Sequence, residues 1–348
     1  MARGPHENLA ENDCSPVGPY DGAAAEEGLW FLPDATFAAA LAPLPHADRR
    51  KLTFPQDWAV AQAALSAELA QLALLYGALE ERLRAGPAGW RHRLALLEAA
   101  ELSWRVGDRV APARLALWEA LHLSGVQEDA GGLARASWAL RRLTGGAGPD
   151  TPGPGQGLAD FLGRHGPEVA DLRGLGTDLA HLHPVTRAVA LFHGWRMLGQ
   201  DGQEATRDME AAVLAGRVAA EMGRGTEGGF VPQVMAGFVA VGGGSVTERL
   251  AAWLIGAERA TRAALMHLDR LRDWGARAGE ILADLQGRTP DLMVALFTEW
   301  VMVTVPMAEK ITGASKATVQ RNLTLMQARG LIREVTGQGR YRVWTAKM

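Results

Sequence analysis

Apolar residues recur in steps of three and four along most of this sequence, the spacing that places them on one face of an α-helix. Before residue 330 no stretch alternates apolar and polar residues as a half-buried strand does. From Gln56 to Arg84 the pattern predicts one long amphipathic helix that ends at Gly86-Pro87. Further helices are predicted over about 89–106, 112–124, 129–143, near 158, and over 183–198, 203–222 and 246–285. We therefore expect an all-α, multi-helix body.

Composition suggests how the chain is divided. Residues 1–28 are polar, acidic and rich in glycine, proline and alanine, so we expect a disordered tail. The run TGGAGPDTPGPGQG at 144–157 predicts a linker or a long surface loop. It separates an N-terminal helical region, 29–143, from a second helical region, 158–288, which contains a long helix at 245–285. Residues 289–348 form the C-terminal part.

The long helix carries a seam of small and apolar residues with a repeat close to 3.5 residues, the spacing that lets helices pack along their length. Packing against the same chain is the favoured explanation, and a homodimer seam is the alternative. The seam consists of Leu250, Leu254, Ala257, Thr261, Ala264, Leu268, Leu271, Gly275, Ala278, Leu282 and Leu285.

The bulk composition excludes several classes of protein. Apolar residues make up 48% of 348 residues and the mean hydropathy is −0.05, values typical of a globular protein. No run approaches the roughly 18 apolar residues that a membrane-spanning helix needs, and the N-terminus lacks the layout of a secretory signal. Cys14 is the only cysteine, which excludes an internal disulfide and a thiolate metal cage. A cytoplasmic protein is expected.

Charge is unevenly distributed. Residues 289–348 contain eight basic and four acidic side chains, a net charge of +4, which leaves −7 for residues 1–288 out of the total of −3. Three of the four lysines also lie in the last 40 residues. This asymmetry favours a C-terminal surface that faces a polyanion.

The order of elements in the C-terminal part is the most specific signal. Thr289-Pro290-Asp291 predicts a helix start with a capping hydroxyl, an early proline and an acid on the helix dipole. Thr304 and Ser315 are expected to cap a second, short helix and a third helix, with Gly313 in the turn between them. After Gly330, the runs LIREV and YRVWT, joined by TGQGR, predict a hairpin. This is the order of a winged helix-turn-helix.

The third of these helices has two predicted faces. Val319, Leu323 and Met326 share one face and are expected in the core. The opposite face carries alanine, glutamine, arginine and threonine, which can contact base edges in the major groove. Lys316 at the helix N-terminus and Arg340 at the hairpin tip are expected to contact phosphate, or in the case of Arg340 the minor groove. The candidate DNA-binding residues are Ser315, Lys316, Ala317, Thr318, Gln320, Arg321, Thr324, Arg333 and Arg340.

These observations favour a sequence-specific transcriptional regulator that binds double-stranded DNA. A homodimer is expected because one recognition helix reads only a few base pairs. The alternative is a helical adaptor whose winged helix docks a protein partner, since a charge of +4 is modest for a nucleic-acid surface. A small-molecule effector that acts on the body is left open.

Two stretches carry a family resemblance. They are SKATVQRNLTLMQARGLIREVTGQGRYRVW near the C-terminus and ALEERLRAGPAGWRHRLALLEAAELSWRVGDRVAP in the N-terminal helical region, together about a fifth of the chain. Both resemble a bacterial family of uncharacterised helix-turn-helix proteins that is common on the large replicons of rhizobia and their relatives. The resemblance implies an all-α body joined to a DNA-binding end, and it brings no settled biological role.

Other patterns of catalytic or ligand-binding chemistry are weak. GRGTEG at 223–228 fits a dinucleotide-binding pattern but follows a predicted helix instead of a strand. His181, His183 and His193 lie close together in sequence, yet a predicted turn separates the first two from the third. No nucleophile–base or paired-carboxylate set stands out. We therefore predict no cofactor, no metal and no enzyme activity.

Two groups of large side chains are assigned by their helical positions. Trp90, Trp104, Trp118 and Trp138 are expected in the core. The arginines of 91–93 and 141–142 are expected on solvated faces.

Overall fold

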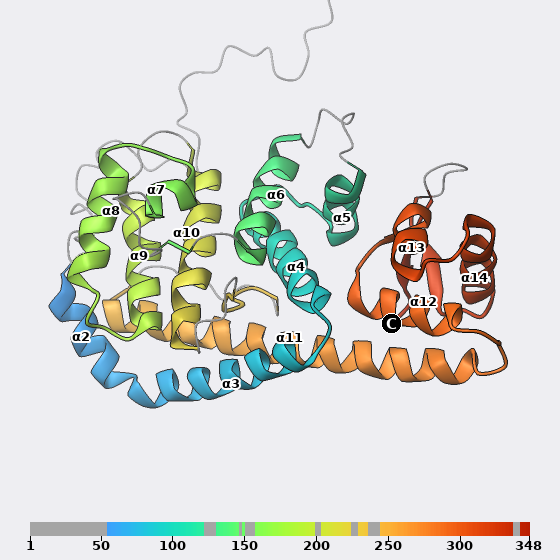
Figure 1. The fold of residues 1–348 in the computed structure, drawn as a ribbon. Helices are drawn as coiled ribbons and strands as arrows, with labels where there is room; N and C mark the ends of the chain where they lie inside the picture. The colour runs from blue at the N-terminus through green and yellow to red at the C-terminus, as the bar shows by residue number, and fades with distance from the viewer. Residues whose placement is uncertain are drawn as a thin grey trace, which may run out of the picture. The chain divides into compact units, whose positions relative to one another are not determined.

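The computed structural model of the protein describes residues 54–348, except 122–129, 146–147, 150–156, 199–202, 224–228, 236–243 and 337–341. The predicted tail at 1–28, most of the predicted linker and the GRGTEG stretch beyond Gly223 lie outside the described residues. Helices make up most of the described chain, and its strands all follow residue 302 (Figure 1). The prediction of a mainly α-helical protein is confirmed.

The single helix predicted over 56–84 is wrong. The chain forms α2 (Pro55–Ala64) and α3 (Ser66–Ala85), which meet at Leu65 with a bend of 78°. Both helices pack against α11 (Val246–Ile281), and α2 also contacts α9 (Pro184–Leu198). No glycine or proline marks the bend, so packing overrides the local periodicity here.

The next three helices follow the predicted pattern closely. They are α4 (Gly89–Arg105), α5 (Pro112–Leu121) and α6 (Ala130–Thr144). α4 ends where Gly107 adopts a φ of +91°, a conformation that favours glycine. α4 packs against both α5 and α6.

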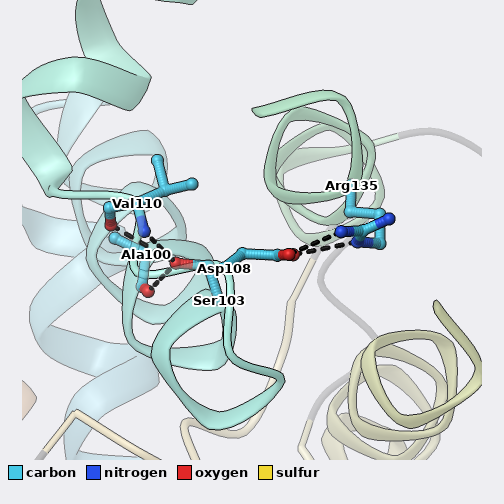
Figure 2. A network of polar contacts seen from close by, with 5 residues as sticks. All are labelled: Ala100, Ser103, Asp108, Val110 and Arg135. Atoms are coloured by element: carbon cyan, nitrogen blue, oxygen red, sulfur yellow. Dashed lines mark hydrogen bonds and ion pairs between the residues drawn. The ribbon is translucent and has the colours of Figure 1, made fainter. Parts of the chain in front are cut away.

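A polar network fixes the turn between α4 and α5 (Figure 2). The Ser103 hydroxyl donates to the Ala100 carbonyl at 2.6 Å and accepts from the Val110 amide at 2.9 Å. Asp108 accepts two hydrogen bonds from Arg135 of α6, one of them from Nε at 2.9 Å. The turn is therefore tied to the helix before it and to α6.

Four further helices and a 3-10 turn precede α11. They are α7 (Gly157–Leu162), α8 (Pro167–Asp178), α9, α10 (Glu204–Ala219) and η3 (Ala220–Met222). α8 was not predicted. α10 is buried on every side from Met209 to Ala219, because this stretch is composed largely of small and apolar side chains that pack against α9 and α6.

The seam on α11 is buried within the same chain. The helix starts at a capping box, in which the Ser245 hydroxyl accepts from the Glu248 amide and the Glu248 carboxylate accepts from the Ser245 amide at 2.7 Å. The seam residues are buried, apart from half-buried Gly275 and Leu285. The helix ends at Ile281, short of the predicted 285, so Leu282 and Leu285 follow it; the other seam residues lie on the helix that α2, α3, α9 and α12 (Thr289–Glu299) contact. The intrachain explanation therefore accounts for the seam, and a dimer would need another surface.

Two apolar clusters form the core. The larger one runs from Trp58 of α2 to Leu271 of α11, includes helices from both sides of the predicted linker, and also takes in Met302 and Val343 near the C-terminus. The smaller one joins the end of α11, at Trp274, Ala278 and Leu282, to the C-terminal elements. Within the described residues no single helix is long and apolar enough to cross a membrane; only α2 and α3 counted together reach that length, and they are bent.

Two predictions about large side chains on α4 are wrong. Trp104 is 53% exposed, because it lies with Glu101 on the helix stripe that faces away from the core. Arg93 is only 2% exposed. It donates to the carbonyls of Phe297 at 2.8 Å and Trp300 at 2.5 Å, which ties α4 to the end of α12. Burial lowers the pKa of Arg93 to about 10.

Candidate nucleic-acid interface

The C-terminal part consists of short elements around a small sheet. After α12 come β1 (Val303–Thr304), α13 (Val305–Thr312), α14 (Lys316–Ala328), β2 (Ile332–Glu334) and β3 (Val343–Ala346). The three strands are antiparallel in the order β1-β3-β2. The predicted pairing of the last two strands is present. β1 was missed because two residues are too few to show an alternating pattern.

Local capping explains where the helices of this part begin and end. The Thr304 hydroxyl accepts from the Met307 amide at 3.3 Å, and the Ser315 hydroxyl accepts from the Thr318 amide at 3.4 Å. Gly313, with a φ of +66°, ends α13 and makes the turn into α14. The cap predicted at Thr289 is wrong, since α12 includes Thr289 and its N-cap, Arg288, makes no side-chain capping bond.

One face of α14 is anchored in the smaller apolar cluster. Val319, Leu323 and Met326 are at most 1% exposed, as predicted. At the end of α14, Arg329 donates to Asp284 at 2.7 Å and to the Ile281 carbonyl at 2.6 Å. These bonds fix the end of α14 to the end of α11, and they hold the pKa of the Asp284 carboxyl below its ordinary value.

The opposite face of α14 is open to solvent. The predicted residues on it are exposed except Thr318, which is half-buried. The Thr318 hydroxyl lies 3.0 Å from the Ser315 hydroxyl, so both belong to the cap and are poorly placed to read bases. The exposed predicted residues of this segment are Ser315, Lys316, Ala317, Gln320, Arg321 and Thr324.

Several cations on this surface are not used inside the protein. Within the described residues, Lys316, Arg321 and Arg333 make no hydrogen bond or ion pair through their side chains, and each is exposed. Arg342 differs, because it pairs with Glu334 at 3.5 Å. An unpaired cation can neutralise a phosphate without first breaking an internal bond.

The sequence analysis did not single out Lys310, and its prediction for Arg340 has no counterpart in the described residues. Lys310 lies exposed in the last turn of α13, three residues before Gly313, and its side chain has no partner among the described residues. Its place at the end of the helix that precedes the predicted recognition helix was the available signal. Arg340 lies outside the described residues, so its predicted place at the hairpin tip stays a prediction.

The histidines singled out in the sequence do not come together. Over the described part of the chain, no group of three or more histidine, cysteine or acidic residues is placed to hold a metal ion. His181 is exposed, whereas His193 is 2% exposed with Nδ1 3.5 Å from Arg249. Burial, together with Arg249 and other nearby arginines, lowers the pKa of His193 to about 3.

Comparison with known proteins does not identify the chain. No protein-family model matches the sequence, and no curated protein matches it significantly. The family resemblance seen in the sequence therefore stays a prediction.

Proposed function

We propose that residues 289–348 form a winged helix-turn-helix and that the protein is a sequence-specific DNA-binding regulator of transcription. In this proposal α13 and α14 are the helix-turn-helix, α14 is the recognition helix, and β2 with β3 carries the wing. The family resemblance in the sequence supports the same assignment.

The observation that carries the proposal is the pair of faces on α14. One face is fixed in a core, while the other presents Gln320 and Arg321 and, one turn later, Thr324 to solvent. Glutamine and arginine are the side chains that pair in two-bond geometry with adenine and guanine in the major groove. Lys316 lies exposed at the start of α14, and Lys310 and Arg333 lie exposed on the neighbouring α13 and β2, where they would contact phosphates.

We further propose that the DNA-bound form is a homodimer. A single recognition helix covers only a few base pairs, and a second copy would double the length of the site. The seam on α11 is buried in its own chain, so the two copies would meet through a different surface.

The experiment uses the full chain and a random duplex library, from which bound sequences are selected over several rounds. The affinity for the selected duplex is then measured at increasing salt. We expect one sequence pattern to be enriched and the affinity to fall linearly on a log-log plot, with a slope of about −0.9 for each neutralised phosphate. An unenriched library and a salt-independent affinity would contradict the proposal.

A protein-docking adaptor is the second candidate, because a net charge of +4 over residues 289–348 is modest for a nucleic-acid surface. Arg340→Ala separates the two functions. In a DNA reader the change weakens binding to selected and random duplexes alike and lowers the salt slope by about one unit. An adaptor would show no change in either quantity.

A further inference from the structure

A cavity of about 270 Å³ lies between α4 and α11. Leu97 and Glu101 line it from α4, and Ala263, Met266, His267 and Arg270 line it from α11. It is somewhat smaller than the roughly 300–1,000 Å³ of sites for drug-sized ligands, so it fits a small molecule.

The remaining wall of the cavity is held in place by a buried carboxylate. Met235 contributes to the lining, and the two residues before it donate their amides to Glu98. The Gln233 amide lies 2.7 Å and the Val234 amide 3.2 Å from a Glu98 oxygen. Glu98 lies on α4 between two lining residues, Leu97 and Glu101, so the cavity is built on a fixed support.

Opposite charges line the cavity without pairing. Glu101 and Arg270 both face it, and among the described residues neither forms an ion pair or a hydrogen bond through its side chain. Most other lining side chains are apolar. A carboxylate on α4 and a guanidinium on α11, with mostly apolar side chains around them, match a ligand that carries both charges.

His267 supplies a third polar group. Its Nε2 atom is buried and has no hydrogen-bond partner. Burial lowers the pKa of His267 to about 4, and Arg93 and Arg270 act in the same direction. The ring is therefore neutral at neutral pH and adds no charge to the cavity wall.

We propose that this cavity binds a small zwitterion with an apolar tail, namely an apolar α-amino acid. Its carboxylate accepts from Arg270, and its ammonium group donates to Glu101. Its side chain contacts Leu97, Ala263 and Met266. This site is independent of the DNA-binding proposal, because it lies in the helical body and is tested without DNA.

The test is calorimetric titration of the full chain with leucine, methionine and phenylalanine. Each charge is isolated by two analogues of leucine: 4-methylpentanoate lacks the ammonium group, and 3-methylbutylamine lacks the carboxylate. Loss of a hydrogen bond to a charged group lowers affinity about tenfold or more. We expect leucine to bind at least about tenfold more tightly than either analogue.

Exposed side chains allow matched variants that keep the fold. Glu101→Gln and Arg270→Gln should each weaken leucine binding about tenfold or more. Arg277→Gln, two turns along α11 and also exposed, should bind leucine like the unmodified protein. The proposal is overturned if no amino acid binds, if an analogue binds as tightly as leucine, or if Arg277→Gln loses as much affinity as Arg270→Gln.

Discussion

Glu98 makes the stability of this protein depend on pH in a predictable direction. Its carboxyl group is 1% exposed, and burial raises its pKa to about 7, although amide hydrogen bonds from residues 233–235 act against the increase. The ordinary value is 4.5. Because the folded-state pKa is the higher one, the folded protein holds the proton more tightly than the unfolded chain. The stabilisation that protonated Glu98 contributes is therefore fully present below about pH 4.5, and it is lost as the pH rises to about 7 and above.

The size of the effect follows from this difference in pKa. Since one pKa unit corresponds to about 1.4 kcal/mol, ionising Glu98 lowers the free energy of unfolding by about 3 kcal/mol across this window. Glu98→Gln removes the titrating group. The free energy of unfolding of the unmodified protein, minus that of the variant, should fall by about this amount between pH 4.5 and 7.5.

Urea denaturation at several pH values measures this difference directly and cancels the contributions of the other titrating groups. Glu68→Gln, on the exposed side of α3, is the matched control for replacing a glutamate with glutamine. A difference for Glu98→Gln that is constant, or that rises with pH, would refute the reasoning.

Three other perturbations test the fold. Arg93→Met leaves the Phe297 and Trp300 carbonyls without their donor and should cost about 2 kcal/mol or more in denaturation experiments; an unchanged stability would count against the tie between α4 and α12. Gly132→Ala places a Cβ 2.9 Å from Asp108 Cβ, so the free energy of unfolding should fall by about 1–3 kcal/mol, seen as a lower melting temperature. An unchanged melting temperature would show that the turn at Asp108 moves aside without cost. Leu268→Glu buries a charge in the α11 seam and should unfold the protein, as circular dichroism would detect; an unchanged helical signal would contradict the burial of the seam within the same chain.

Much of the helical architecture could be predicted from the sequence because its signals are local. Glycines and prolines mark most helix ends, and the anchoring face of α14 followed from the spacing of Val319, Leu323 and Met326. The bend at Leu65 could not be predicted, since it arises where two helices pack against α11 and not from any residue at the bend. β1 was missed for a related reason: its two residues become a strand only by pairing with β3.

The burial of single polar residues was also out of reach. Arg93 lies in a basic run that is typical of a solvated face, yet the partners that bury it are carbonyls about 200 positions later in the chain. Glu98 and His267 are likewise defined by neighbours that are distant in sequence. The solvent-exposed face of α14 could be predicted because its residues share one helix, whereas the cavity between α4 and α11 could not.

The central claim is that α14 reads bases while its flanking cations bind phosphates. Arg321→Ala and Lys316→Ala separate these roles, because both residues are exposed and unpaired within the described part of the chain, so neither change disturbs an internal bond. Arg173→Ala on α8, an exposed arginine outside the C-terminal part, serves as the control.

The decisive measurement is the affinity of these variants for the selected duplex and for a scrambled duplex across a range of salt. Arg321→Ala should lose about tenfold or more on the selected duplex and much less on the scrambled one. Lys316→Ala should lose similarly on both and reduce the salt slope by about one unit, while Arg173→Ala should change neither. If Arg321→Ala binds the selected duplex as the unmodified protein does, or loses equally on both duplexes, α14 does not read sequence and the account is contradicted.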